Sequence, residues 1–216
     1  MDCKAVIFDL DGVLVFTDKY HYKAWKKLAD RLDIDFTEED NDRLRGVSRA
    51  ESLEIILEKY HGEPISEDVK EKYLEEKNEI YREYLGTMTR NDVDSAVRDN
   101  LNLLRNAGLR LAVGSSSKNT AYILERTELT DAFDAVADGT QITRSKPDPE
   151  VFLKAAKLLG EDPDNCLVVE DADAGIEAAK AAGMHTAAIG AAARSEAAEY
   201  NLTGIEELPV IIGIAQ

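Results

Sequence analysis

The chain has 216 residues, of which 44% are hydrophobic and 32% charged, and this composition predicts a folded protein rather than a disordered one. Its formal net charge of -17 argues against nucleic acid and anionic membrane surfaces as partners, because both attract clustered Lys and Arg. The two cysteines, Cys3 and Cys166, each adjoin an apolar run, so we expect buried free thiols in a reducing compartment, the cytoplasm.

The first predicted element is a strand at Ala5–Phe8, which follows the amino terminus without a recognisable signal peptide. It leads into Asp9-Leu10-Asp11-Gly12. If the backbone turns at Asp9, the carboxylates of Asp9 and Asp11 can converge at the carboxyl end of the strand, where open α/β sheets bind their ligands. Such crowded carboxylates predict a hard cation such as Mg²⁺, and a carboxylate can also act as a nucleophile. An acidic turn without function is the simpler alternative.

A long charged segment from about Asp18 to Leu85 has helical periodicity and no good strand candidate. Its apolar stripes, for example Ala24, Trp25 and Leu28, predict a helical bundle. No apolar segment of the chain approaches the length that crosses a bilayer.

From Asp94 onward, strands and helices alternate, which predicts a parallel sheet with right-handed crossovers. The expected strands are Leu109–Val113, Ala135–Val136, Cys166–Val169 and Thr186–Ile189, and the expected helices are Ala96–Asn106, Lys118–Glu125, Glu150–Leu159 and Ala174–Ala182. The predicted fold is therefore α/β, a Rossmann-like parallel-sheet core (residues 1–15 and 88–216) with an inserted α-helical cap domain (residues 16–87).

Three further groups of polar residues follow predicted strands. Ser115, Ser116, Ser117, Lys118 and Asn119 precede a helix, where hydroxyl and backbone N–H groups can bind phosphate, although serine at a helix start is also an ordinary N-cap. Lys146 precedes a helix that begins near proline and could neutralise a phosphoryl group, although most lysines are simply solvated. Glu170 and Asp171 suggest a second part of the metal site, with helix capping by Asp171 as the alternative.

Together these residues provide a nucleophile, a metal site and positive charge at one sheet edge, which is the equipment for phosphoryl transfer. The motifs Asp9-Leu10-Asp11-Gly12, Ser115, Lys146-Pro147 and Glu170-Asp171 resemble the four motifs of the haloacid dehalogenase superfamily. Within it, the chain resembles the β-phosphoglucomutase family over nearly its full length, through Thr17–Trp25, Leu44–Arg49, Lys77-Asn78 and Ser115–Asn119.

The resemblance implies roles for the core residues. Asp9 would become an aspartyl-phosphate, and Asp11 would be the general acid and base. Mg²⁺ would be held by Asp9, the backbone carbonyl of Asp11, Glu170 and Asp171. Ser115 and Lys146 would bind the transferring phosphoryl group.

The resemblance also implies substrate-binding roles for cap residues and for part of the serine loop. Arg49, with Ser116, Lys118 and Asn119, would hold the non-transferring phosphate. Thr17, His21 and Lys77 would position the sugar, and the further contact residues would be Trp25, Gly46, Val47 and Ser48. Read without the motifs, His21 would be a packing residue, and Arg49 and Lys77 would be solvated.

The chain departs from the family at both crossings into the cap. Phe16 stands where an Asp is common, and Asp94-Ser95-Ala96 replaces the usual Pro-Gly. The implied activity is the interconversion of β-D-glucose 1-phosphate and glucose 6-phosphate through glucose 1,6-bisphosphate, by a monomer with a small-molecule sugar phosphate as its partner. A Mg²⁺-dependent sugar-phosphate phosphatase and a non-catalytic binding protein are the alternatives.

Overall fold

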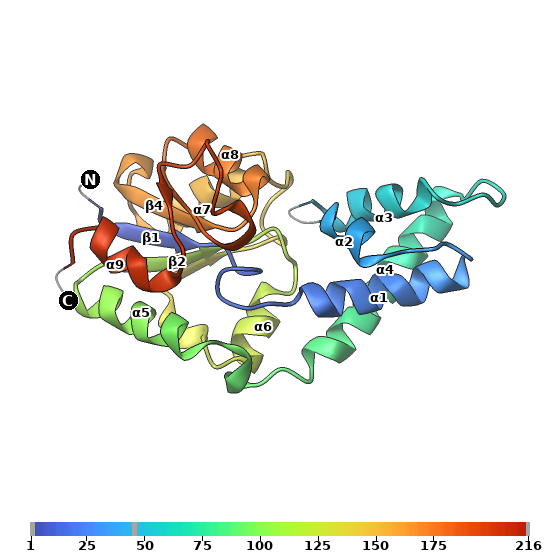
Figure 1. Ribbon diagram of the computed structural model, residues 1–216, viewed down its shortest axis with the longest axis horizontal. Coiled ribbons are helices and arrows are strands. Elements are labelled where there is room, and N and C mark those ends of the chain that lie inside the picture. Colours follow the sequence, from blue (N-terminus) through green and yellow to red (C-terminus); the bar gives the residue numbers. More distant parts are fainter. Residues whose placement is uncertain (1–2, 45–46, 215–216) are drawn as a thin grey trace. The chain divides into compact units, whose positions relative to one another are not determined.

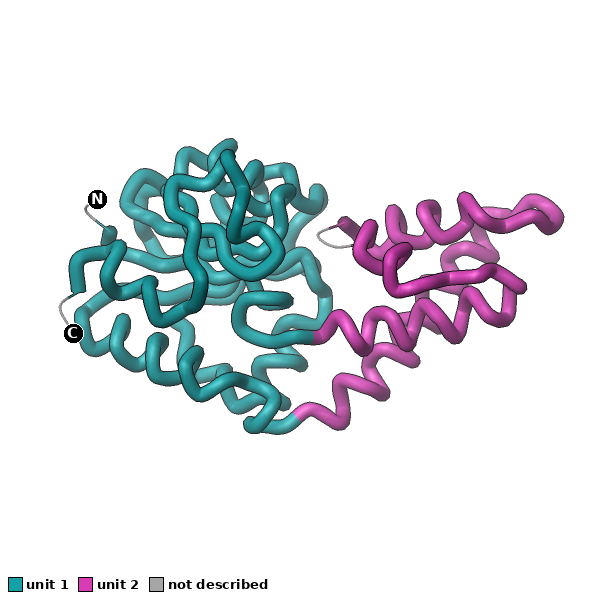
Figure 2. The backbone as a smooth tube through the Cα atoms, viewed as in Figure 1, with its two compact units in different colours: residues 1–16, 89–216 teal, residues 17–88 magenta. Residues whose placement is uncertain are grey.

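The computed structural model describes residues 3–44 and 47–214. The chain divides into two compact units, residues 1–16 with 89–216 and residues 17–88 (Figure 2). The expected core and cap differ from these units by one residue at each crossing, since Phe16 belongs to the first unit and Met88 to the second.

The first unit is built on a six-stranded sheet in the order β3-β2-β1-β4-β5-β6, and every strand pair is parallel (Figure 1). The strands are β1 (Ala5–Phe8), β2 (Arg110–Gly114), β3 (Ala135–Ala137), β4 (Cys166–Glu170), β5 (His185–Ala188) and β6 (Tyr200–Asn201). Burial of β1 on both faces explains its unbroken apolar sequence, because helices cover both sides of a parallel sheet.

Helices α7 (Glu150–Leu159) and α8 (Asp173–Ala181) pack on one face of this sheet, and α5 (Ser95–Asn106) packs on the other (Figure 1). The remaining helices of the unit are α6 (Thr120–Arg126) and α9 (Leu208–Ile211), with 3₁₀ turns at Arg90–Asp92, Thr130–Ala132, Pro163–Asn165, Gly190–Ala192 and Ile205–Glu207. The alternating βα pattern of the sequence therefore folds as expected into an α/β core.

Some predicted boundaries were wrong. Helix α6 begins at Thr120 rather than Lys118, and the serine cluster precedes it in a loop, as expected. Cys166 is buried as expected, whereas Cys3 is only half-buried. Both are free thiols.

The second unit contains only helices among its described residues: α1 (Asp18–Arg31), α2 (Glu38–Asp42), α3 (Arg49–Leu57) and α4 (Glu67–Leu85). Its core is the apolar face that the sequence pattern predicts, with Trp25, Leu28, Phe36 and Leu53 almost fully buried. Helix α1 packs along α4, which brings residues from the two ends of this unit together.

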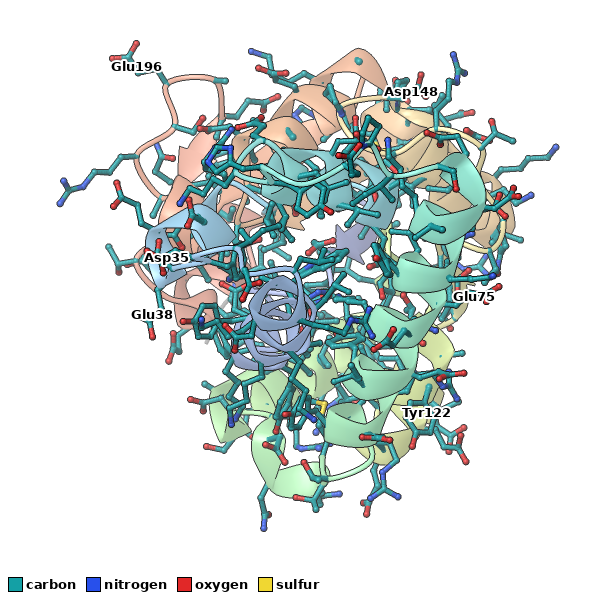
Figure 3. All side chains as sticks on the ribbon, turned by 90° about the vertical axis from the view of Figure 1, so that its right-hand side faces the viewer. Asp35, Glu38, Glu75, Tyr122, Asp148 and Glu196 are labelled. Carbon is teal, nitrogen blue, oxygen red and sulfur yellow. The ribbon has the colours of Figure 1, made fainter. Side chains whose placement is uncertain are left out.

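Acidic side chains are distributed over the surface of both units. Asp35, Glu38, Glu75 and Glu196 are exposed, and in Figure 3 they extend away from the ribbon. Among the described residues, no helix is long and apolar enough to span a membrane.

Candidate active site

The pairing register of β1 and β4 places two carboxylates side by side at the carboxyl end of the sheet. Phe8 pairs with Val169, and the backbone N–H of Asp9 then donates to the carbonyl of Val169 (2.9 Å). Asp9 therefore lies level with Glu170, the last residue of β4. Since all strands are parallel, the residues that follow β1, β2 and β4 meet at one edge.

Asp9, Glu170 and Asp171 form a compact group of carboxylates. One ligand oxygen from each lies within 4.8 Å of the others. Burial, followed by the negative charge of Asp9, raises the pKa of Glu170 well above its ordinary value, and its Oε2 atom is buried without a hydrogen-bond partner. Three crowded carboxylates with an unsatisfied buried oxygen fit a hard divalent cation, which would favour the ionised form of Glu170.

Asp11 is half-buried, and its side chain is not a member of this carboxylate group. The convergence of the Asp9 and Asp11 carboxylates stays a prediction, whereas Asp9 does lie close to Glu170 and Asp171. Asp11 lies in the turn after β1, where it forms an isolated β-bridge with Val15.

Two glycines make room for the acidic pair: Gly12, noted from the sequence only as part of a motif, and Gly175, which was not selected from it. A Cβ at Gly12, whose φ is +86°, would lie 1.9 Å from Oδ2 of Asp171. A Cβ at Gly175 in α8 would lie 1.8 Å from Oε1 of Glu170. Their proximity in sequence to Asp11 and to Glu170-Asp171 was the available signal, but glycine alone does not reveal which side chain approaches it.

Lys146 reaches the carboxylates from the loop between β3 and α7. Its Nζ atom donates to Oδ1 of Asp9 (2.5 Å) and to Oε1 of Glu170 (3.4 Å), and its side chain is only 3% exposed. Burial by itself lowers the pKa of Lys146, but the charges of Asp9 and Glu170 outweigh burial and raise it. Lys146 is therefore a buried ammonium group, not the solvated lysine of the simpler alternative.

The loop after β2 is rigidly hydrogen-bonded. The backbone N–H of Ser115 donates to the carbonyl of Ala137 (3.1 Å), and the Oγ of Ser115 accepts from the N–H of Ser117 (3.1 Å). The Oγ of Ser116 is buried without a partner, Asn119 is buried and Lys118 is exposed. Backbone hydrogen bonds fix this loop, and the unpartnered hydroxyl of Ser116 can therefore donate a hydrogen bond to an anionic oxygen.

A second polar group lies inside the helical unit, where Nζ of Lys77 is 2.9 Å from Nδ1 of His21. An ammonium group only donates, so Nδ1 accepts and the neutral imidazole carries its proton on Nε2. Burial lowers the pKa of His21 well below its ordinary value, and the charges of Lys77 and Arg49 lower it further. Lys77 is almost fully buried, so it too differs from a solvated lysine.

Aromatic rings surround this pair. The Nζ of Lys77 lies 4.7 Å from the ring centroid of Trp25 and 4.6 Å from that of Tyr81. The hydroxyl of Tyr81 donates to Oγ1 of Thr17 (3.1 Å), and its ring lies 4.1 Å from that of His21. Tyr81 was not selected from the sequence, where it reads as one apolar position of a helix.

Arg49 begins helix α3, and Ser48 is the N-cap of that helix. The Oγ of Ser48 accepts from the N–H of Glu51 (3.2 Å) while the carboxylate of Glu51 accepts from the N–H of Ser48 (3.0 Å). Burial lowers the pKa of Arg49, and both Arg49 and Val47 are half-buried. Gly46 lies outside the described residues.

A family model of haloacid dehalogenase-like hydrolases matches residues 3–183. The chain belongs to this family.

Relatives within the haloacid dehalogenase-like hydrolases include mutases and phosphatases. The chain is 41% identical to a β-phosphoglucomutase of Bacillus subtilis over 188 residues, which is 87% of this chain and 83% of that protein. It is 32% identical to a phosphorylated carbohydrates phosphatase of Thermotoga maritima, over 84% of this chain and 82% of that protein. These relatives are enzymes, so the non-catalytic alternative is set aside.

A solved structure of a β-phosphoglucomutase from Clostridium difficile has the same fold. It matches with a TM-score of 0.88 and 37% sequence identity, over 95% of this chain and 93% of that one. The predicted α/β fold of this haloacid dehalogenase-like chain is confirmed.

Proposed function

We propose that the chain is a Mg²⁺-dependent β-phosphoglucomutase, which interconverts β-D-glucose 1-phosphate and glucose 6-phosphate through glucose 1,6-bisphosphate. The observation that carries the proposal is a pair of separate polar clusters. The Asp9 group, in the first unit, consists of Asp9, Glu170, Asp171 and Lys146. The His21 group, in the helical unit, consists of His21, Lys77 and Arg49, and its last two members supply positive charge. A mutase needs two phosphate sites because its bisphosphate intermediate must turn and return its other end. A phosphatase needs one.

In the proposed mechanism, Asp9 attacks phosphorus and the bond from phosphorus to the sugar oxygen breaks. Asp11 gives its proton to that leaving oxygen and, in the return step, removes the proton of the attacking sugar hydroxyl. Asp9, Glu170, Asp171 and the backbone carbonyl of Asp11 would hold Mg²⁺, which when bound would supply positive charge against the transferring phosphoryl group.

Side chains of the protein also stabilise the negative charge of the two phosphate groups. Lys146 and Ser115 neutralise and orient the transferring phosphoryl group, and the buried position of Lys146 strengthens this interaction because little water screens it. Arg49, Ser116, Lys118 and Asn119 hold the other phosphate. The sugar is positioned by Thr17, His21 and Lys77, together with Gly46, Val47 and Ser48. Trp25 contacts Lys77 from within the core of the helical unit.

The deciding experiment supplies β-glucose 1-phosphate, Mg²⁺ and a trace of glucose 1,6-bisphosphate, and measures glucose 6-phosphate and free phosphate separately. We expect glucose 6-phosphate to form much faster than phosphate, and Asp9→Asn to abolish both. Rapid phosphate release with little glucose 6-phosphate would contradict the mutase assignment.

The second candidate is a sugar-phosphate phosphatase. Two observations favour it: the similarity to the Thermotoga maritima phosphatase, and Phe16, which is 65% exposed at the first crossing where an acidic residue is common in the family. The same assay separates the two candidates.

Arg49→Ala tests the two-site argument directly. We expect mutase activity to fall by about 100-fold, because a charge-assisted phosphate clamp is lost, while phosphate release changes much less. The matched control is Arg43→Ala, which removes an exposed arginine of the same unit that forms an ion pair with the exposed Glu58 (2.8 Å). Equal losses of both activities in Arg49→Ala would overturn the argument.

We also propose that the protein works as a cytoplasmic monomer with a small-molecule sugar phosphate as its partner. The free thiols of Cys3 and Cys166 support a reducing compartment. Light scattering at working concentration tests the oligomeric state, and a dimer mass would contradict it.

A further inference from the structure

Phe152 has no part in the mechanism above, yet its ring lies against the lysine of the site. The Nζ atom of Lys146 is 4.7 Å from the centroid of the ring. Phe152 is fully buried and the Lys146 side chain is 3% exposed, so little water separates or screens the two groups. The attraction between a cation and the face of an aromatic ring is strongest under such desolvated conditions.

The ammonium group of Lys146 has two kinds of partner, charged carboxylates and a neutral aromatic ring. Two hydrogen bonds lead to the carboxylate oxygens of Asp9 and Glu170. The Phe152 ring is a neutral partner, since it offers the negative face of its π system and no lone pair. The ring thus attracts the charge without competing for the hydrogen bonds that a phosphoryl oxygen would accept.

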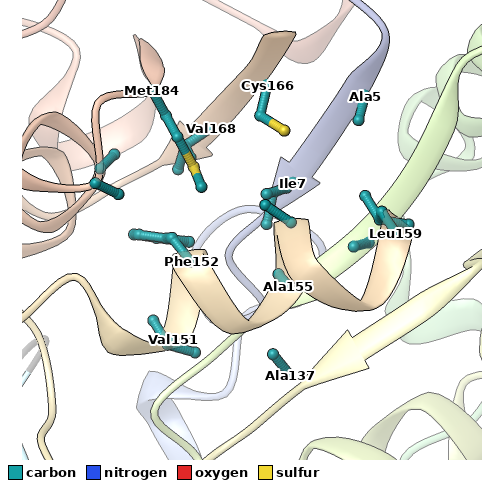
Figure 4. Packing of buried hydrophobic residues seen from close by; sticks show 14 of the residues in the cluster. Ala5, Ile7, Ala137, Val151, Phe152, Ala155, Leu159, Cys166, Val168 and Met184 are labelled. Carbon is teal, nitrogen blue, oxygen red and sulfur yellow. The ribbon is translucent and has the colours of Figure 1, made fainter. Parts of the chain in front are cut away.

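The surrounding backbone leaves a place for this ring. Phe152 lies in the first turn of α7, six residues after Lys146, so one short segment carries both groups. A Cβ at Gly114 would lie 2.8 Å and 2.9 Å from Cδ1 and Cε1 of the ring, so only glycine fits at the end of β2 without displacing it. Figure 4 shows Phe152 between α7 and the sheet, in the cluster that also contains Ile7 and Val168.

We propose that Phe152 is the positioning residue of Lys146. Its ring holds the ammonium group in place throughout the phosphoryl-transfer cycle. This inference rests on the proposed function, in which Asp9 becomes phosphorylated. On phosphorylation the Asp9 oxygen that attacks phosphorus enters an acyl-phosphate bond and the carboxylate loses its charge. The ion pair with Lys146 then weakens, whereas the attraction of the ring is the same before and after transfer.

The proposal predicts an effect on the chemical step rather than on sugar binding. Lys146 is expected to neutralise the transferring phosphoryl group, and other residues hold the sugar and the second phosphate. Weakening the attraction between the Phe152 ring and the Lys146 ammonium group should therefore lower kcat and leave KM for the sugar phosphate nearly unchanged.

The experiment replaces Phe152 by site-specific incorporation of 4-fluoro-, 3,5-difluoro- and 3,4,5-trifluorophenylalanine. Fluorine withdraws electron density from the ring face with little change in volume, so packing is retained while the cation–ring attraction falls. We expect the rate constant for Asp9 phosphorylation by glucose 1,6-bisphosphate, measured in a single turnover, to fall stepwise by roughly tenfold across the series. A rate constant that does not change across the series would overturn the proposal.

A matched control is the same series at Phe36, a buried phenylalanine that stacks on Tyr22 in the helical unit, with ring centroids 5.8 Å apart. No trend is expected there. A parallel trend at Phe36 would show that fluorination acts through general packing and would also overturn the proposal.

A second measurement does not depend on the proposed function. In protein labelled with ¹⁵N-lysine and free of sugar phosphate, NMR relaxation reports the order of the Lys146 ammonium group. Order that falls with fluorination supports the role of Phe152 even if Asp9 is never phosphorylated, an outcome that would refute the proposed function alone. Order that stays constant overturns the role of Phe152.

Discussion

A methyl group at residue 175 would lie 1.8 Å from Oε1 of Glu170 and 2.1 Å from its Cδ, far inside van der Waals contact. In Gly175→Ala the carboxylate must therefore move, and we expect the affinity for Mg²⁺ to fall by about 10- to 100-fold, the usual effect of disturbing the support of a metal ligand. A Mg²⁺ titration of activity measures this change.

The control for Gly175→Ala is Gly108→Ala. Nothing lies within 4 Å of a Cβ at Gly108, whose φ is +87°, so that variant strains the backbone without touching a carboxylate. It should lose about 1 kcal/mol of stability and keep its Mg²⁺ dependence. An unchanged Mg²⁺ affinity in Gly175→Ala would show that Glu170 does not bind the metal.

Because His21 is neutral, we expect the stability of the protein to depend on pH. Its pKa in the folded protein is lowered, so between that value and about 6.5 the unfolded chain binds a proton that the folded protein does not. Stability should therefore fall as the pH drops below about 6.5, by at most about 1.4 kcal/mol per pH unit.

The measurement compares urea unfolding of the parent protein and of His21→Gln from pH 5 to pH 8. Both proteins retain His61 and His185, so the difference between them isolates His21. A difference that does not vary with pH would contradict the buried neutral imidazole.

Residues such as Asp9 and Lys146 were predictable because their chemistry and their position after a strand point to the same site. Gly175 and Tyr81 were not. The role of Gly175 depends on where the Glu170 side chain turns, and that of Tyr81 on the packing of α1 against α4, neither of which follows from local sequence pattern.

Helix α3 holds Arg49 in its first turn through the capping box of Ser48 and Glu51. Ser48→Ala should cost about 1 kcal/mol of stability and, because the helix start frays, raise KM for the sugar phosphate. The proposed roles of Arg49 and of Ser48 itself in substrate binding are the reason for the expected change in KM.

Thr37→Ala is the matched control, because Thr37 closes an equivalent capping box on α2 in the same unit. Chemical unfolding should show a similar loss of stability for both variants, and steady-state kinetics should show a raised KM for Ser48→Ala alone. A raised KM in both would assign the effect to the whole unit instead.

At the scale of elements, β1 and α7 matched the sequence prediction residue for residue, because hydrophobic periodicity and clear end signals agree there. Strand β6 was not predicted. It has two residues, Tyr200 and Asn201, and exists only through pairing with β5, which local periodicity does not report.

The whole molecule carries a net charge of -17, and the three carboxylates of the Asp9 group concentrate negative charge at one place, where Asp9 and Glu170 are buried. Mg²⁺ should therefore stabilise the folded protein more than NaCl of equal ionic strength does, by about 2.7 kcal/mol at 100 times its Kd. Either salt screens all surface charges, whereas specific binding of Mg²⁺ requires the carboxylates of Asp9, Glu170 and Asp171.

Thermal unfolding in the two salts measures the difference, with Glu170→Gln as the control that should remove it. If Mg²⁺ and NaCl stabilise the parent protein equally at matched ionic strength, the carboxylate group is not a metal site.

The position of β1 within the sheet also constrains how the protein folds. Ala5 pairs with Arg110 on one side and with Cys166 on the other, so β1 is synthesised before both of its neighbours and can pair with β4 only after residues 166–170 have been made. Contacts so distant in sequence form slowly, and pulse-labelled hydrogen exchange should find the β1 amides protected late. An apolar strand that lacks its neighbours during synthesis is exposed to pairing with other chains. Asp9, the proposed nucleophile at its end, lies level with Glu170 only once β1 and β4 have paired.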